Sequence, residues 1–441
     1  MTLRPVRIAG TLALLIVGLA PAALDATGQR PSAGTAADIP LPASDERALH
    51  CTIVTIDSHI DVPANFATAE VDPGTDSDAQ LTLHKMDEGC LDAVFLVAAV
   101  GQDKRSNAHY QRAADNALKM IAGIQRMTQQ YPERIELART ADDLVRIAGT
   151  GRHAALIGLE NGYALGSDLE QLQTFFDLGV RYITLTHSGH NALADSSVPI
   201  AELGDAQEEH AGLSRLGREL IARMNCMGIM VDVSHVSKKT MLQAITASRA
   251  PVIASHSAAR SVANTPRNMD DEQLQRLAQR GGVVQVVGYS HYIRLNDPAK
   301  ERAIAQVGEE LGLAGPMAWA RASNSTLVEY GHRLVALDRQ WPRANVADYV
   351  DHIEHIVDLV GIDHVGIGSD FYAGGGAASG GLQGWMDVAQ NPAITAELLR
   401  RGFSAGDIAR IWGGNLLRVM RETAQVARSC AQSPPGPMPP E

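Results

Sequence analysis

The sequence predicts an α/β protein built as one (β/α)8 barrel, the TIM-barrel architecture. Short aliphatic runs alternate with longer helical patterns, which is typical of βαβ units and a parallel sheet. There are eight such runs, the number that a closed barrel requires. Titratable side chains stand at the ends of most of these runs. In a parallel barrel those ends share one face.

The predicted strands are short and rich in aliphatic and β-branched residues, a composition that favours buried parallel strands. In chain order they occupy residues 53–61, 91–100, 154–160, 181–187, 228–235, 250–256, 281–289 and 363–370. Helical patterns lie between them, most clearly at 108–130, 213–227, 237–248, 270–280 and 347–360. Residues 291–345 interrupt this rhythm. We expect them to form a helical lid or rim between the seventh and eighth strands.

The N-terminus has the features of a signal peptide, which we predict at residues 1–26. Arg4 and Arg7 precede an apolar run that starts at Ile8, and alanines flank Pro21. The run is short for a membrane span, and no later stretch is long and apolar enough to be one. We therefore expect an exported protein, periplasmic or secreted, without a stable membrane span after cleavage. An N-terminal membrane anchor is the alternative.

The rest of the chain predicts a single catalytic domain over residues 46–430. Residues 27–45 are rich in Ala, Pro, Gly and Ser, as a flexible spacer would be. Residues 431–441 are rich in proline and are predicted to be a disordered tail. The formal net charge of −12 argues against a nucleic-acid partner, because phosphate binding needs a concentrated basic surface. The oligomeric state stays open, with a homodimer among the expectations.

The four cysteines are Cys51, Cys90, Cys226 and Cys430, and none forms a C-x-x-C motif. That spacing argues against zinc–thiolate and redox motifs. In an oxidising compartment, four cysteines allow three pairings. Cys51 precedes the first predicted strand and Cys430 follows the last helical pattern. Because a closed barrel brings its two ends together, a Cys51–Cys430 bridge is our hypothesis.

Seven titratable side chains stand at the ends of six predicted strands. They are His59, Asp61, Glu160, His187, His235, His256 and Asp370. In a barrel of parallel strands, all of these ends open on the face where such enzymes place their active sites. The sequence therefore predicts that these side chains converge at one mouth.

Five of these residues have the chemistry of metal ligands. His59 and Asp61 are two residues apart in a strand, so their side chains face the same way. Glu160 ends an otherwise apolar run, where an unpaired carboxylate is costly. His235 and His256 end consecutive strands about 4.8 Å apart, and neutral imidazole is a good zinc ligand. The alternatives are a surface glutamate and two core histidines bonded to backbone carbonyls.

Nitrogen and oxygen donors without a thiolate suit zinc or another borderline divalent ion. A shared carboxylate would hold two ions about 3.5–4 Å apart, which lowers the pKa of a bridging water and polarises a carbonyl. Asp370 is then a candidate general base and proton carrier. His187 could bond a developing oxyanion or a neighbouring loop. Arg267, in the loop after the sixth strand, could hold a substrate carboxylate or face solvent.

Several ordered motifs resemble the membrane dipeptidase (renal dipeptidase) family. They are SHID at 58–61, GLENG at 158–162, LTHS at 185–188, VDVSHVS at 231–237, APVIASHS at 250–257, RN at 267–268, GSDF at 368–371 and GNLLRV at 414–419. This similarity extends from about residue 53 to 421. The family is a branch of the metal-dependent amidohydrolase-type barrels, with two zinc ions bridged by a glutamate.

The resemblance implies a role for each site residue. His59 and Asp61 would bind one Zn²⁺, His235 and His256 would bind the other, and Glu160 would bind both. His187 would contact the scissile carbonyl, and Asp370 would manage the proton. Arg267 would receive the terminal carboxylate of the substrate. Tyr292 falls where the family has a tyrosine near the same group.

The resemblance also implies a small peptide substrate. The family cleaves dipeptides, often with a D-residue at the C-terminal position, and some members open β-lactam rings. This chain departs from the family where Tyr372 and Ala373, followed by glycines, replace an Asp-Gly pair. The alternatives are another hydrolase on the same scaffold, such as an N-acyl amino acid hydrolase, a lactonase or a peptide-maturation enzyme, or a catalytically silent binding protein.

Overall fold

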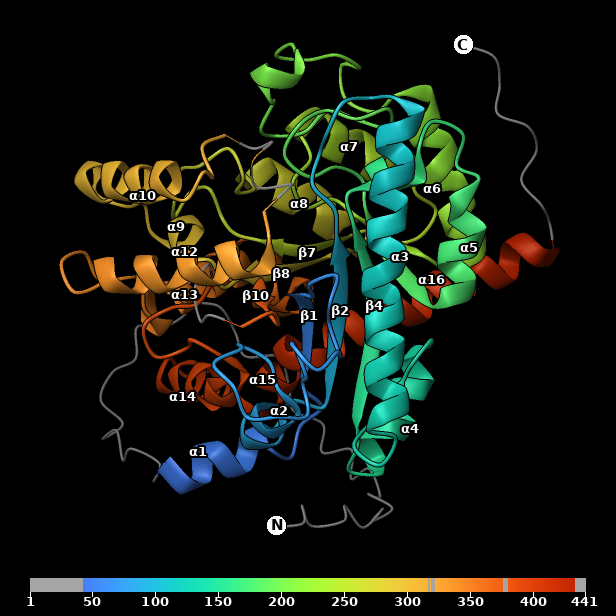
Figure 1. The fold of residues 1–441 in the computed structure, drawn as a ribbon. Coiled ribbons are helices and arrows are strands. Elements are labelled where there is room, and N and C mark those ends of the chain that lie inside the picture. Colours follow the sequence, from blue (N-terminus) through green and yellow to red (C-terminus); the bar gives the residue numbers. More distant parts are fainter. Residues whose placement is uncertain (1–42, 316–317, 319–321, 376–379, 433–441) are drawn as a thin grey trace, which may run out of the picture.

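The computed structural model describes residues 43–432, except 316–317, 319–321 and 376–379. Parallel strands form one continuous sheet in the order β10-β1-β2-β4-β5-β6-β7-β8-β9, and helices surround it (Figure 1). The predicted (β/α)8 barrel is confirmed. All eight predicted strands are present. They are β1 Ile56–Asp61, β2 Ala93–Ala99, β4 His153–Glu160, β5 Val180–Thr184, β6 Met230–Asp232, β7 Ile253–Ser257, β8 Val283–Val287 and β9 Val365–Gly368.

Two short strands were not predicted. β3, Ile135–Leu137, pairs with the first residues of β4. β10, Phe371–Tyr372, follows β9 after two residues and pairs with β1, whereas β9 pairs with β8. The segment 365–372 therefore closes the barrel. Within it, the backbone N–H of Asp370 donates to the carbonyl of His59 at 3.0 Å. Closure thus fixes Asp370 beside β1.

The five predicted helices are present within one or two residues of their expected bounds. They are α3 Asn107–Gln130, α6 Arg215–Met227, α7 Lys238–Ala247, α8 Asp271–Gln279 and α13 Val346–Val360. Further helices are α1 Ala43–His50, α2 Leu83–Glu88, α4 Ala141–Gly149, α5 Gln171–Leu178, α14 Pro392–Arg400, α15 Ala405–Ala409 and α16 Asn415–Gln432. Side-chain caps begin several of these helices. At α4, for example, Thr140 and Asp143 form a capping box.

The excursion at residues 291–345 is helical, as expected. It contains α10, Pro298–Glu310, and α12, Asn324–Leu337, which lie side by side (Figure 1). Leu313, Tyr330 and Leu334 form a small apolar cluster of their own there. The excursion therefore has a small apolar core of its own and lies on the barrel rim. The excursion begins in α9, Ser290–Ile293, which carries Tyr292.

The barrel has two apolar layers because side chains alternate along each strand. In β2, Val94, Leu96 and Ala98 pack with the surrounding helices, whereas Phe95 belongs to the cluster inside the barrel. That inner cluster includes Leu416, Val419 and Met420 of α16. α16 therefore closes the amino end of the barrel, and the carboxyl end is left for polar side chains.

The cysteine pairing differs from the hypothesis. Cys51 is bonded to Cys90, and Cys226 to Cys430, so the Cys51–Cys430 bridge is wrong. Cys51 follows α1 and lies beside the turn between α2 and β2, where Cys90 stands. Cys430 is at the end of α16, which packs along α6 and its Cys226. The ends of the barrel are near each other, but a disulfide requires Cα atoms about 5.5 Å apart.

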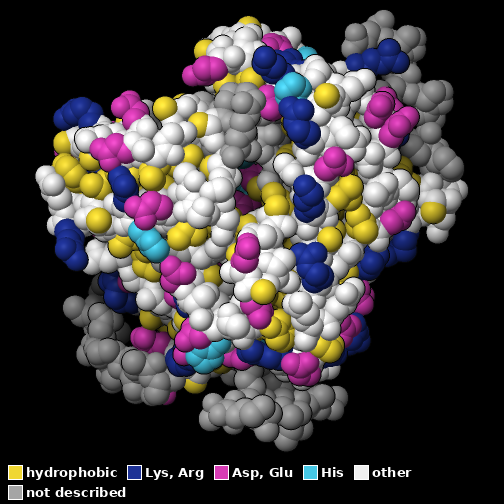
Figure 2. All heavy atoms as spheres, viewed as in Figure 1, with side chains coloured by type: hydrophobic (Ala, Val, Ile, Leu, Met, Phe, Trp, Pro, Cys, Tyr) yellow, Lys and Arg dark blue, Asp and Glu magenta, His cyan; other side chains and the backbone are white. Residues whose placement is uncertain are grey.

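The predicted signal peptide lies outside the described residues, as do most of the spacer and the tail. α1 begins at Ala43, inside the segment predicted as spacer, and α16 continues to Gln432, two residues into the predicted tail. Among the described residues, no helix has both the length and the apolar character that a membrane crossing requires. Basic and acidic side chains are interspersed over the face shown in Figure 2.

Removing either disulfide should destabilise the protein. The Cys226–Cys430 bridge spans 204 residues and the Cys51–Cys90 bridge spans 39. Loop-closure entropy then assigns about 5 and about 4 kcal/mol to the two bridges. We expect Cys226→Ser/Cys430→Ser to lower the thermal unfolding midpoint more than Cys51→Ser/Cys90→Ser. Peptide mapping without reduction checks the pairing, and a Cys51–Cys430 peptide would contradict it.

Candidate metal centre

The predicted site residues converge at the carboxyl end of the barrel. His59 and Asp61 stand in the last three residues of β1, Glu160 ends β4, and His256 lies in β7. The loops after β5, β6 and β9 carry the remaining members, which are His187, His235 and Asp370. Three overlapping groups of these side chains each hold their ligand atoms within 4.8 Å of one another.

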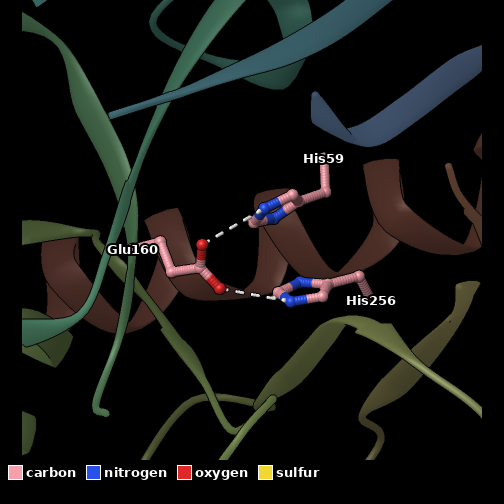
Figure 3. A group of neighbouring side chains, drawn as sticks. All are labelled: His59, Glu160 and His256. Carbon is pink, nitrogen blue, oxygen red and sulfur yellow. Dashed lines mark ion pairs between the residues drawn. The ribbon is translucent and has the colours of Figure 1, made fainter. Parts of the chain in front are cut away.

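Glu160 is at the centre of the cluster. Its Oε1 lies 2.9 Å from Nε2 of His235 and 3.2 Å from Nε2 of His256. Its Oε2 lies 3.7 Å from Nε2 of His59. Figure 3 shows the carboxylate between His59 and His256, with one oxygen turned toward each ring. A carboxylate with donors on both sides has the arrangement of a ligand shared by two cations.

A second group forms around His59 on the solvent side. Its Nε2 is 3.3 Å from Oδ1 of Asp61 and 4.0 Å from Oδ1 of Asp370. The side chain of His59 is fully buried, whereas those of Asp61 and Asp370 are 28% and 20% exposed. A ligand entering the mouth would therefore meet the two aspartates before the histidine.

Several buried atoms of the cluster have no hydrogen-bond partner among the described residues. These atoms are Nε2 of His59, Oδ1 of Asp61 and Oε1 of Glu160. Unpaired buried polar atoms are costly, and those in native structures mark an ion or water that completes them. All three are nitrogen or oxygen donors of the kind that zinc takes. The residues present therefore fit a metal site.

The protonation of the histidines reflects the same electrostatics. Burial lowers the pKa of His59, but the Glu160 and Asp61 carboxylates outweigh it and raise that pKa well above its usual value. Burial, followed by the positive charge of Arg267, lowers the pKa of His235 well below the ordinary range. Burial and then His59 do the same to the pKa of His256. The carboxylates thus favour the protonated form of His59, whereas burial favours the neutral forms of His235 and His256.

Asp370 is a carboxyl group with an unusual pKa and an unusual backbone conformation. Burial raises its pKa to about 7, with the Asp61 and Glu160 carboxylates acting in the same direction against the opposing effect of His59. Its backbone is in the left-handed region, at φ 60°, as is that of His235, at φ 65°. Non-glycine residues adopt this region rarely and at an energetic cost, and such residues gather at functional sites.

Hydrogen bonds behind the cluster orient two of the imidazoles. The hydroxyl of Tyr182 lies 2.8 Å from Nδ1 of His59 and donates to the carbonyl of Ser58. The hydroxyl of Ser255 lies 2.8 Å from Nδ1 of His256 and donates to the buried carboxylate of Asp232. Fixing Nδ1 in this way leaves the Nε2 lone pair directed into the cluster, as in metal sites generally.

Gly158 makes room for this support. A Cβ at position 158 would lie 2.4 Å from the ring of Tyr182, a distance that no side chain tolerates. The glycine two residues before Glu160 therefore lets the tyrosine reach across the barrel to His59. The same strand thus supplies both the central carboxylate and the space for the residue that positions a neighbouring histidine.

Arg267 is buried at the edge of the cluster. It is 5% exposed, and its guanidinium donates to the hydroxyl of Ser257 at 3.1 Å and to the carbonyl of His256 at 2.9 Å. Its Nε has no partner, and among the described residues no carboxylate forms an ion pair with it. The ring of Tyr292 lies 5.5 Å below the guanidinium carbon. A buried positive charge without a counter-ion is suited to a carboxylate ligand.

His187 stands beside the histidine pair. Its ring centroid is 4.3 Å from that of His235, and it joins Glu160 and His235 in one of the three groups. The structure thus brings all seven strand-end residues together with Arg267 and Tyr292. Sequence reasoning missed the residues behind them, namely Tyr182, Asp232 and the role of Ser255. The one available signal was a buried aspartate inside the apolar run 228–235.

A family model described as membrane dipeptidase (peptidase family M19) matches residues 43–434. The chain belongs to this family. Dipeptidase tcpJ of Claviceps purpurea is 32% identical over 361 residues, which cover 81% of this chain and 72% of that protein. Dipeptidase 3 of Rattus norvegicus is 34% identical, over 80% of this chain and 61% of that protein.

Solved structures of the membrane dipeptidase family share the fold. The probable dipeptidase PvdM of Pseudomonas aeruginosa superimposes with a TM-score of 0.76 at 32% identity, covering 87% of this chain and 99% of that one. A structure described as dipeptidase AC, a metallopeptidase of family M19, gives a TM-score of 0.63 at 24% identity, over 84% and 99% of the two chains. The chain is thus a member of a metallopeptidase family whose curated relatives are dipeptidases.

Tyr182→Phe should weaken metal binding without unfolding the protein. The change removes only the hydroxyl that fixes Nδ1 of His59, and loss of such a partner costs about 10- to 100-fold in metal affinity. Competition with a chromogenic chelator measures the affinity. Tyr349→Phe is a matched control, because the hydroxyl of this buried tyrosine donates to the carbonyl of Val286 and has no hydrogen bond to a member of the cluster among the described residues. Equal affinity in both variants would exclude a positioning role for Tyr182.

Proposed function

We propose that this protein is a binuclear zinc dipeptidase that hydrolyses the peptide bond of dipeptides. The observation that carries this proposal is the Glu160 carboxylate, buried between imidazoles that approach both of its oxygens. Membership of the membrane dipeptidase family supports the reaction class. The metal site is supported by the buried nitrogen and oxygen atoms of the cluster that have no hydrogen-bond partner among the described residues.

In this proposal the five ligand residues hold two zinc ions. His59 and Asp61 bind one ion, His235 and His256 bind the other, and Glu160 binds both. Bound zinc ions would supply an activated water and polarise the scissile carbonyl. The low pKa values of His235 and His256 support their role, because only a neutral imidazole offers a lone pair to a metal. The proton drawn onto His59 would be displaced on metal binding.

Arg267 binds the terminal carboxylate of the dipeptide. Its guanidinium is buried and has a free Nε, so an incoming carboxylate would gain charge-assisted hydrogen bonds without displacing an internal partner. Tyr292 packs against the guanidinium and shapes the same subsite. Arg267 lies close to the cluster, so the carboxylate that it binds belongs to the residue just after the scissile bond. The substrate therefore ends at its second residue. We propose that this residue can have the D configuration.

Asp370 and His187 act on the reacting bond. Asp370 accepts a proton from the attacking water and delivers it to the leaving amine, which suits a carboxyl group whose pKa is about 7. His187 donates a hydrogen bond to the carbonyl oxygen as negative charge develops on it. Its position next to His235 and Glu160 puts it within the same polar group.

The site of action we propose is outside the cytoplasm, in the periplasm or the medium. The signal-peptide pattern in residues 1–26 supports export. Two disulfides and no free cysteine among the described residues agree with an oxidising compartment. A small peptide is the proposed partner of the site, and a homodimer is the proposed assembly.

The test of the function uses zinc-loaded protein with L,L-dipeptides, L,D-dipeptides and the corresponding dipeptide amides. We expect hydrolysis of both dipeptide series and at least about 100-fold lower kcat/KM for the amides, because the amides lack the charge that Arg267 binds. Arg267→Ala should lose most of this preference, and Arg267→Lys should retain part of it. If Arg267→Ala cleaves dipeptides with unchanged kcat/KM, the dipeptidase assignment is wrong.

Asp370→Asn should separate metal binding from catalysis. The substitution removes the proton carrier and leaves the five ligands intact, so we expect about two zinc ions per chain and a kcat lower by about 10²- to 10⁴-fold. Elemental analysis and dipeptide turnover provide the two readings. A chelator should abolish the activity of the wild type and added zinc should restore it. Normal turnover by Asp370→Asn would refute the assigned role.

A further inference from the structure

A cavity lined by arginines lies at the end of the barrel opposite the metal centre. It has a volume of about 500 Å³ and is bounded by the start of α4, by the first residues of β5 and β6, and by one side of α16. Five guanidinium side chains line it. They are Arg139, Arg181, Arg418, Arg421 and Arg428, and together they define what we call the arginine cleft. None of them belongs to the metal centre.

The positive charge of the arginine cleft is only partly balanced. Arg421 lies 3.5 Å from the Asp142 carboxylate, and Arg418 lies 3.3 Å from that of Glu422. Among the described residues, no carboxylate forms an ion pair with the other three arginines. A chain with a formal net charge of −12 therefore concentrates positive charge in this one cavity.

Arg181 is held in place by groups that leave its charge intact. Its Nε donates to the carbonyl of Arg139 at 2.8 Å, and its Nη1 donates to the carbonyls of Phe176 and Val180 at 3.0 and 2.8 Å. Its guanidinium carbon lies 4.4 Å from the centre of the Phe176 ring. Its Nη2 makes no hydrogen bond with a described residue. The guanidinium is thus oriented in advance, with one edge available.

The surroundings of Arg181 disfavour its positive charge. Burial, followed by the neighbouring charge of Arg139, lowers the pKa of Arg181 to about 10, against the opposing effect of the Asp143 and Asp177 carboxylates. The Nη1 of Arg139 donates to the carbonyl of Asp177, and its guanidinium has no carboxylate partner among the described residues. Arg428 is exposed on α16 and forms no ion pair with a carboxylate of the described residues. An anion in the cleft would relieve the repulsion between Arg139 and Arg181.

We propose that the arginine cleft binds a small molecule that carries two or more phosphate or carboxylate groups. The planar guanidinium matches both groups with paired hydrogen bonds. A cavity of about 500 Å³ is within the size range of small-molecule sites. Because three of the five arginines have no carboxylate partner among the described residues, the cleft favours a ligand with more than one negative charge. This site lies at the amino ends of the strands and does not depend on the proposed dipeptidase reaction.

The test is isothermal titration calorimetry on the zinc-loaded full chain with glucose 1,6-bisphosphate. The two phosphates of this probe are at opposite ends of the sugar, so they do not chelate one zinc ion. We expect one binding site, whose affinity falls as the salt concentration rises. In Arg139→Gln/Arg428→Gln the affinity should drop at least about tenfold, since bonds to charged groups are lost. Dipeptide turnover by this variant should match that of the wild type.

Controls make the result specific. Arg302→Gln removes an exposed arginine of α10, outside the arginine cleft, and should bind the probe as the wild type does. Titration with tricarballylate, a tricarboxylate, shows whether carboxylates serve as well as phosphates, and binding of either probe with loss in the double variant supports the site. If neither probe binds, or if the double variant binds both with unchanged affinity, the proposal is overturned.

Discussion

The structure depends above all on a carboxylate buried where three imidazoles approach it. Glu160 could not remain charged at the end of an apolar strand unless positive charge were close by. His59 is buried beside carboxylate oxygens that have no hydrogen-bond partner among the described residues, and these oxygens also require positive charge nearby. The two divalent cations that we propose would meet this demand, because each cation would turn a repulsive group of donors into a set of ligands. The barrel supplies the remaining condition, which is a rigid frame for donors from distant parts of the chain.

That frame is supported by layers that do no chemistry themselves. Tyr182 and the Ser255–Asp232 pair hold the Nδ1 atoms of two histidines, which directs their Nε2 atoms into the cluster. Closure of the barrel by the segment 365–372 brings Asp370 beside β1, with a backbone conformation that is unusual outside glycine. The strain at this residue is tolerated because hydrogen bonds on both sides of it fix the strand pairing.

The two ends of the barrel have different electrostatic character. The carboxyl end gathers carboxylates and imidazoles around Glu160, and the excursion with α10 and α12 packs on the rim of this end. The amino end is closed by α16, whose apolar face enters the barrel while its arginines line the cleft beside β5 and β6. One amphipathic helix therefore completes the core and presents positive charge, which the negative net charge of the whole chain conceals.

The sequence by itself determined the (β/α)8 barrel and the residues that meet at its mouth. Apolar runs and helical patterns are local, and a strand end in a parallel barrel has only one face to open on. The tertiary structure alone decided the disulfide partners. Cys51 and Cys90 are bonded because two turns of the chain lie side by side, and the spacing of the cysteines in the sequence does not predict this. The tertiary structure also decided the contact of Tyr182 with His59 and the grouping of arginines around α16. These depend on packing between segments distant in the chain, where displacements of an ångström separate contact from none.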